Sequence, residues 1–177
     1  MIYGERIRLR APERGDLSRF VTWLNDPDVH KNLAISLPLS LAEEERWFES
    51  MLQQSPPEHS MVIEIREGDG WIPVGNCGFH TIDWRSRSGE LGLFIGEKSL
   101  WNQGYGTETV RLLLRHGFNT LNLHRIALRV FETNPGGIRA YEKAGFVREG
   151  RFRQAEYQDG RYIDVLYMSV LRSEFKE

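Results

Sequence analysis

The sequence predicts an α/β fold, in which a mixed, mostly antiparallel sheet and its flanking helices form one domain over residues 1–177. Three observations lead to this prediction. The length of 177 residues fits one domain of ordinary size. Hydrophobic residues make up 40% of the chain, which is enough to build a core. The apolar period alternates between about two and about 3.6 residues, and one strand–helix–strand crossover lies between antiparallel hairpins.

Two helices are expected after a short first strand. Residues 5–10 alternate charged and apolar side chains, which is typical of a half-buried strand. A helical pattern starts at Asp16 and is interrupted at Asp26-Pro27. Ser40-Leu-Ala-Glu43 is a capping box that opens the second helix, which Pro56-Pro57 ends. The apolar residues that the two helices turn inward are Phe20, Trp23, Leu24, Trp47, Phe48, Met51 and Leu52.

Three strands are expected in the middle of the chain. The first covers Met61–Glu67, and the turn Glu67-Gly-Asp-Gly70 leads to a second strand that runs through Thr81. The third strand, Gly89–Gly96, is apolar on both faces. Such a strand is typical of the centre of a sheet that is covered on both sides.

The C-terminal half alternates helices and strands. A loop with Gly104 and Gly106 leads into a long amphipathic helix, and Arg125–Phe131 is the next strand. A further helix covers Asn134–Ala144 and is ended by Gly145. The last elements are the strands Gly150–Tyr157 and Arg161–Leu171, with the hairpin turn Gln158-Asp-Gly-Arg between them.

Charge and cysteine usage exclude several classes of protein. The chain has 23 Lys and Arg against 25 Asp and Glu, which argues against a nucleic-acid partner. Cys77 is the single cysteine and the five histidines show no His-x3-His spacing, so neither a disulfide nor a metal site is expected. No apolar run approaches about 18 residues, so no membrane partner is expected. Without a secretory signal at the N-terminus, the protein is predicted to be cytoplasmic.

The segment Trp101-Asn-Gln-Gly-Tyr-Gly-Thr-Glu108 lies between a strand and a long helix. Gly104 and Gly106 let backbone N–H groups converge at the helix N-terminus, which forms an anion cradle suited to a phosphate or pyrophosphate. A nucleoside-triphosphate loop needs a lysine that is absent here, and a dinucleotide fingerprint needs glycine at Thr109. The glycines by themselves fit equally well a tight turn chosen for its backbone angles.

The segment from Asn134 to Phe146 has the features of a well-capped helix. Asn134 can cap it, and Pro135 suits the first helical position. Taken alone, Ile138, Tyr141 and Ala144 are simply its buried face.

Together, these two segments resemble the acetyl-CoA-binding motifs of the GNAT superfamily of N-acetyltransferases. The similarity extends to Gly89-Glu-Leu-Gly-Leu-Phe-Ile-Gly96 and to Tyr162-Ile-Asp-Val-Leu-Tyr-Met-Ser-Val170. Arg8-Leu-Arg-Ala-Pro and Trp23-Leu-Asn-Asp-Pro resemble the branch that contains ribosomal-protein N-terminal acetyltransferases and spermidine acetyltransferases. One departure is Trp101, which stands where the general pattern of the superfamily begins with Arg or Gln.

The resemblance implies a sheet in which the strand Glu90–Gly96 splays from its parallel neighbour and leaves a cleft. The pantetheine arm of acetyl-CoA would pair there with the backbone of Leu93 and Ile95. Asn134 would contact the pantetheine or thioester end. The other cofactor-binding residues would be Phe94, Trp101, Asn102, Gln103, Gly104, Tyr105, Gly106, Thr107 and Lys143.

The resemblance also implies that Tyr141 protonates the departing thiolate. A primary amine has a pKa of about 10, so it must lose a proton before it attacks a thioester. Glu90 is a reasonable base, directly or through water, although it also fits a cross-strand ion pair with Arg85 or Arg87. A backbone N–H near Phe94 would polarise the thioester carbonyl.

The acceptor is expected to be a small-molecule amine such as a polyamine, or a peptide or protein N-terminus. Asp26, Asp28 and Glu43–Glu45 would attract a cation, although a run of glutamates is typical of a solvated helix face. By the same resemblance, His30 lies where the branch places acceptor contacts, although it also fits an ordinary surface histidine. An alternative function is an acetyl-CoA-binding sensor or interaction domain without catalysis. The aromatic residues that would form a homodimer contact, or pack under the sheet, are Tyr157, Tyr162 and Tyr167.

Overall fold

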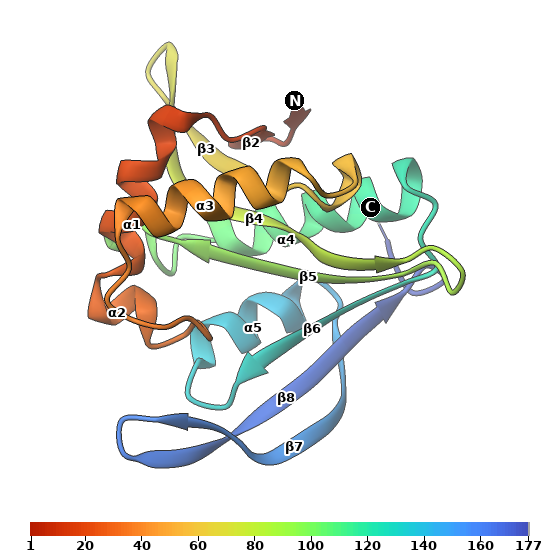
Figure 1. The fold of residues 1–177 in the computed structure, drawn as a ribbon. Coiled ribbons are helices and arrows are strands. Elements are labelled where there is room, and N and C mark those ends of the chain that lie inside the picture. Colours follow the sequence, from red (N-terminus) through yellow and green to blue (C-terminus); the bar gives the residue numbers. More distant parts are fainter. Residues whose placement is uncertain (177) are drawn as a thin grey trace.

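The computed structural model describes residues 1–176, which form one eight-stranded sheet (Figure 1). The strand order is β1-β2-β3-β4-β5-β6-β8-β7, and every neighbouring pair is antiparallel except β5 and β6. The predicted mixed, mostly antiparallel sheet is therefore confirmed. The strands are β1 (Ile2–Tyr3), β2 (Ile7–Arg10), β3 (Met61–Glu67), β4 (Gly70–Asp83), β5 (Ser88–Ile95), β6 (Arg125–Phe131), β7 (Val147–Gln158) and β8 (Arg161–Leu171).

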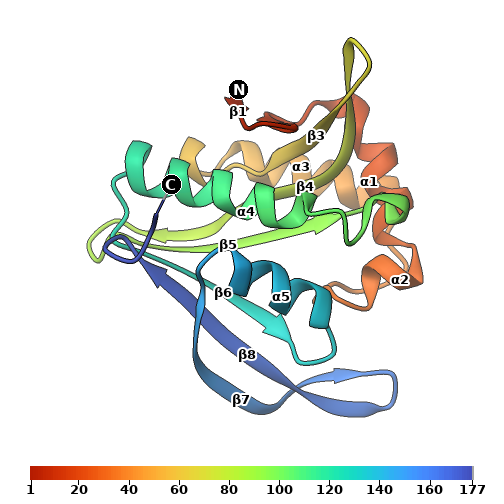
Figure 2. The same ribbon diagram turned by 180° about the vertical axis from the view of Figure 1, so that it is seen from behind.

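Helices cover both faces of the sheet, which Figures 1 and 2 show from opposite sides. The helices on one face are α1 (Leu17–Leu24), α2 (Pro27–His30) and α3 (Leu41–Leu52). Those on the other face are α4 (Tyr105–Arg115) and α5 (Pro135–Lys143). Within residues 1–176, no helix has the length and apolar character needed to cross a membrane.

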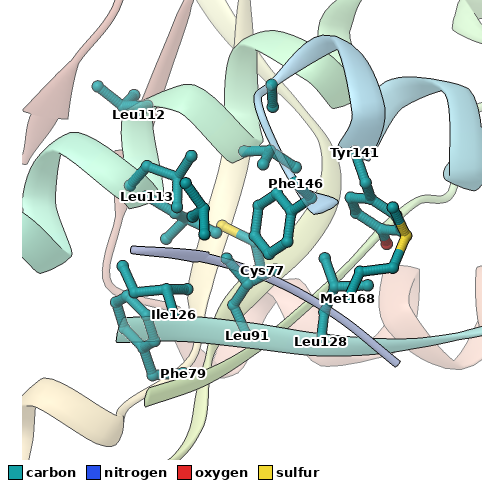
Figure 3. Close-up of a cluster of buried hydrophobic side chains, with 14 of the residues drawn as sticks. Cys77, Phe79, Leu91, Leu112, Leu113, Ile126, Leu128, Tyr141, Phe146 and Met168 are labelled. Atoms are coloured by element: carbon teal, nitrogen blue, oxygen red, sulfur yellow. The ribbon is translucent and has the colours of Figure 1, made fainter. Parts of the chain in front are cut away.

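The central strand β5 sends its side chains into two different hydrophobic clusters. Leu91 lies in the main core, which α4 and α5 cover (Figure 3). Phe94 packs on the opposite face against the cluster of α1 and α3, with its ring centroid 6.4 Å from that of Trp23. Because strand side chains alternate between faces, a strand covered on both sides must be apolar on both, as the sequence predicts.

Among the strands and α-helices, the structure adds one short strand and one short helix to those that the sequence predicts. β1 has two residues and pairs with β2 at the edge of the sheet. α2 has four residues, and the side chain of Asp26 caps it by accepting from the N–H of Asp28 at 2.9 Å. Asp26-Pro27 therefore ends one helix and begins the next. Elements of this length are too short to show a periodic pattern.

The predicted local signals for helix ends and turns are confirmed. The side chain of Ser40 accepts from the N–H of Glu43 at 3.2 Å, and the Glu43 carboxylate accepts from the N–H of Ser40 at 2.8 Å. Gly145, just after α5, has a φ of 102°. Asp159 and Gly160, between β7 and β8, both have positive φ, as a type I′ hairpin turn requires.

A buried ion-pair network ties α1 to the sheet. Glu64 on β3 is 4% exposed and accepts hydrogen bonds from Nε of Arg8 and of Arg10, the latter at 2.7 Å. Arg10 also donates to Asp16, at the start of α1, at 2.7 and 2.8 Å. Burial acts to raise the pKa of Asp16, but the bonds from Arg10 and from the N–H of Glu13 outweigh it and hold the pKa below its ordinary value.

Replacing Glu64 by Gln should lower the free energy of unfolding by about 3 kcal/mol, because it leaves two partly buried arginines without their shared carboxylate. Chemical denaturation at neutral pH measures this loss. The matched control is Glu49→Gln, which removes the exposed ion pair with Arg14 and should change stability by less than about 0.5 kcal/mol. Equal effects of the two substitutions would contradict a structural role for the network.

Candidate active site

The parallel pairing of β5 with β6 stops halfway along the two strands. The last paired residues are Glu90 and Ala127, whereas β5 continues to Ile95 and β6 to Phe131. The predicted splay of β5 is therefore confirmed. A cavity of about 1480 Å³ lies here, lined by residues of α3, β4, β5, β6, α4 and α5. Ligand sites usually measure about 300–1,000 Å³, so this cleft has room for two molecules.

The splay leaves backbone groups of β5 without a neighbouring strand. The N–H of Gly96 donates to the carbonyl of Val74 on β4 at 2.8 Å. Ladder bonds alternate along an antiparallel pair, so the N–H groups of Leu93 and Ile95 face away from β4, toward the gap. The N–H group of Phe94, in contrast, faces β4. The backbone donors expected near Phe94 are therefore the N–H groups of its two neighbours, Leu93 and Ile95. An exposed strand edge of this kind can pair with an extended polar chain.

The cradle at the start of α4 has open backbone donors. Gly104 is the N-cap residue with a φ of 88°, and no side chain caps the helix. The first N–H groups of a helix have no partner within it, so those of Tyr105, Gly106 and Thr107 are available to an anion. A Cβ atom at Gly106 would meet nothing within 4 Å, so the space above the first turn is free. These residues fit a pyrophosphate group.

The side chains of the cradle loop mainly hold the loop itself. The indole Nε1 of Trp101 donates to the carbonyl of Ile95 at 2.8 Å, and Nε2 of Gln103 donates to that of Ser99 at 2.7 Å. Asn102 adopts a positive φ of 62° in the same loop. Trp101, which stands where the superfamily pattern has Arg or Gln, therefore anchors the loop to the end of β5.

Arg6 is a cation beside the cradle that sequence reasoning missed. Its Nη1 donates to the carbonyl of Gln103 at 3.2 Å, and its guanidinium lies 4.6 Å from the ring centroid of Tyr105. Its Nε also donates to Glu108 at 2.8 Å. No local motif could have found this contact, because about a hundred residues separate Arg6 from the loop.

Asn134 and Tyr141 reach the cleft from opposite ends of α5. The side-chain oxygen of Asn134 caps the helix by accepting from the N–H of Gly137 at 2.9 Å. Its Nδ2 has no hydrogen-bond partner among residues 1–176 and is free for a ligand. The ring of Tyr141 lies at the edge of the main core (Figure 3), and burial raises the pKa of its hydroxyl to about 12. Lys143 also lines the cleft.

Glu90 forms an ion pair across the gap. Its Oε1 accepts from Nε of Arg129 on β6 at 2.8 Å. The cross-strand partner is thus Arg129, and the predicted pairing with Arg85 or Arg87 is wrong. Alternate residues of β6 share one face of the sheet, namely Arg125, Ala127 and Arg129. The cation that pairs with Glu90 therefore comes from β6, the parallel neighbour of β5, and not from the hairpin that precedes β5. Both residues line the cleft.

The acidic residues that would attract a cation are separated by the structure. Glu43 serves the capping box of α3, and Glu45 is exposed. Glu44 is 5% exposed, and no hydrogen bond or ion pair reaches its side chain within the described part of the chain. Burial raises the pKa of Glu44 to about 7.

The other predicted acceptor residues lie outside the cleft. Asp26 and Asp28 form ion pairs with Lys98 at 2.8 and 3.1 Å. His30 borders a separate, smaller cavity.

Comparisons with known proteins identify the family. The family model for the acetyltransferase (GNAT) domain matches residues 6–147. An uncharacterized N-acetyltransferase of Bacillus licheniformis is 32% identical over 98% of this chain and 97% of its own. A ribosomal N-acetyltransferase-like protein of Bacillus subtilis is 30% identical over 58% of this chain and 55% of its own.

A third relative has a solved structure. The spermidine N(1)-acetyltransferase of Vibrio cholerae is 30% identical over 97% of this chain and 96% of its own. Its crystal structure with CoA and spermine matches with a TM-score of 0.87 and 28% identity over 97% of this chain and 98% of that one. The predictions of an N-acetyltransferase and of acetyl-CoA as co-substrate are confirmed. The chain belongs to the GNAT family of acetyltransferases.

Proposed function

We propose that this protein transfers the acetyl group of acetyl-CoA to a primary amine of a small cationic molecule. The observation that carries the proposal is Glu44, a buried carboxylate without a partner among the described residues, at the acceptor side of the cleft. The relative named as a spermidine acetyltransferase, whose solved complex contains spermine, supports a polyamine-like acceptor. A peptide N-terminus is the other acceptor that the test below includes.

Glu44 occupies a position that would ordinarily be apolar. Glu44, Trp47, Phe48 and Met51 follow one another at helical spacing on the inward face of α3. A buried carboxylate without a partner loses its hydration and gains nothing in return. A bound ammonium group would favour the charged form and offset this loss. The half-buried ring of Trp47, which also lines the cleft, adds a surface on which a cation can rest.

Different residues of the cleft would bind acetyl-CoA and take part in the transfer. The N–H groups at the start of α4 would hold the pyrophosphate, and those of Leu93 and Ile95 would pair with the pantetheine arm or polarise the thioester carbonyl. Acetyl-CoA supplies an activated acyl group, which the amine attacks directly. Tyr141 would donate a proton to the leaving sulfur. Burial raises the pKa of the phenol to about 12 and so keeps its proton in place at neutral pH.

A homodimer and a cytoplasmic location belong to the same proposal. Tyr157 and Tyr162 are 62% and 64% exposed, and their ring centroids lie 5.0 Å apart on the β7–β8 hairpin. Exposed aromatic pairs at a sheet edge suit a contact between two copies. The third predicted contact residue, Tyr167, instead packs against Phe152 at 6.1 Å. A single cysteine, Cys77, which is buried, is typical of reducing compartments.

Replacing Glu44 by Gln should raise the KM for a small cationic amine about tenfold and change kcat less than about twofold, because the charge that meets the ammonium is lost. Steady-state release of CoA measures both constants, with polyamines and with peptides as acceptors. The matched control is Glu45→Gln on the exposed side of the same helix, which should leave both constants unchanged.

A stability measurement separates this role from a structural one. Glu44 has a folded pKa above its unfolded value, so its cost to stability is absent below the unfolded pKa and complete above about pH 7. The E44Q protein should therefore become more stable relative to the parent as pH rises. An unchanged KM for every cationic acceptor, or a preference for uncharged peptides, would refute the cationic-acceptor proposal.

Replacing Tyr141 by Phe should lower kcat about a hundredfold and leave the Kd for CoA within about twofold, because the phenyl ring keeps the packing but has no proton to donate. Steady-state kinetics and calorimetric titration with CoA measure the two quantities. Tyr3→Phe, on an exposed ring outside the cleft, is the control. Tight binding of CoA without turnover in the parent protein would instead favour the sensor alternative, and full activity of the Y141F protein would remove Tyr141 as the acid.

A further inference from the structure

His80 lies in a β-bulge of β4, beside the splayed strand β5. The pairing passes from Phe79 opposite Leu91 to Thr81 opposite Glu90, so His80 is the extra residue between them. Bulges of this kind redirect a side chain and are frequent next to active sites. Phe79 points into the main core. The imidazole of His80 is accessible to solvent and lines the cleft.

The absent side chain of Gly92 makes room for the imidazole. A Cβ atom at Gly92 would lie 2.0 Å from Nε2 of His80 and 2.9 Å from Cε1, far closer than any real contact. Gly92 and Phe94 point to the same face of β5 because strand side chains alternate. Phe94 contacts the cluster of α1 and α3, so the imidazole lies on the acceptor side of β5. It therefore flanks the segment whose free N–H groups would hold the thioester.

The surroundings of His80 favour the neutral imidazole. Partial desolvation within the cleft lowers its pKa below the ordinary value of 6.5. The charged groups that act on it are Glu90 on β5, which raises the pKa, and Arg129 on β6, which lowers it. No hydrogen bond from residues 1–176 occupies either ring nitrogen. Glu90, in contrast, is occupied, because its Oε1 accepts a hydrogen bond from Nε of Arg129 at 2.8 Å.

We propose that His80 is the general base that takes a proton from the ammonium group of the acceptor. This inference rests on the proposed function, because it requires that the thioester lie along β5. Glu90 then acts as a positioning residue, which is held by Arg129 and sets the electrostatic potential at the imidazole. Gly92 is required because any side chain there would displace the ring.

The protons balance in this scheme. One proton of the ammonium group passes to the neutral imidazole of His80, which leaves a free amine with a lone pair. The lone pair forms the C–N bond, the C–S bond breaks, and the sulfur leaves with its electron pair. Tyr141 gives its proton to the sulfur and regains one from the attacking nitrogen through solvent. The imidazolium releases its proton to water, and the third ammonium proton stays on the amide.

Replacing His80 by Asn or Gln should lower kcat/KM at pH 7 about a hundredfold or more. The pH profile should change shape as well. Activity of the parent should be level between about pH 7 and 9 and fall below the pKa of His80, because protonation removes the base. In the variants, activity should rise about tenfold per pH unit over that range, because only amine that water has already deprotonated can react. His124→Asn, on an exposed histidine, is the control.

A second measurement needs no catalysis. In the free protein, the NMR titration of His80 should give a pKa below 6.5; Glu90→Gln should lower it further, and Arg129→Gln should raise it. Gly92→Ala should shift the imidazole resonances and reduce kcat without loss of folding. An H80Q protein with the parent's rate and pH profile, or a His80 that is protonated at neutral pH, would overturn the proposal. If the parent bound acetyl-CoA but acetylated no amine, the proposed function itself would fail.

Discussion

The site depends on one constraint, which is the end of hydrogen bonding between β5 and β6 after Glu90 and Ala127. Two parallel strands that separate leave backbone groups without partners, and such groups are costly unless a ligand or water satisfies them. The cleft at this gap is lined by residues of α3, which covers one face of the sheet, and of α4 and α5, which cover the other (Figures 1 and 2). The splay therefore supplies a polar strand edge inside a cleft that both layers of helices reach.

The charges that would bind the two substrates are local features of the cleft and do not follow from the net charge of the chain. A formal charge of −2 does not predict affinity for a polyanionic cofactor, but the first turn of α4 offers backbone donors and a helix dipole at one point. On the opposite side, α3 presents the buried Glu44 to the cleft. In the proposed arrangement, the positive potential for a phosphate and the negative potential for an ammonium group are separated by β5. Both molecules would then bind near one strand without competing.

Much of this arrangement could be predicted from local sequence signals. The capping box at Ser40, the cap at Asn134 and the paired glycines of the cradle are all short-range patterns, and each lies where it was expected. The contacts that the sequence could not supply join distant segments. Arg6 reaches the cradle from the N-terminus, and Arg129 meets Glu90 from a parallel strand. Such contacts depend on strand order, which no local pattern specifies.

The bulge at His80 and the burial of Glu44 escaped prediction for a related reason. The register shift at His80 depends on how β4 pairs with β5, and no local pattern within β4 shows it. Three successive glutamates likewise give no sign of which one faces inward. Departures from regular pattern of this kind are common at functional sites, because the side chain is placed for a ligand rather than for the fold. At Trp101 the residue type departs from the superfamily pattern, but its side chain has a structural role, because the indole N–H holds the loop to the carbonyl of Ile95.

The most direct test of this account is the change in amide hydrogen exchange when CoA is added to the protein. We expect strong protection at the N–H groups of Leu93 and Ile95, which face the gap, and at those of Gly106 and Thr107 in the cradle. The N–H of Phe94, which faces β4, should be protected already without CoA. Protection that appears elsewhere, with none on β5 or at the start of α4, would contradict the claim that the splay of the two strands creates the binding site.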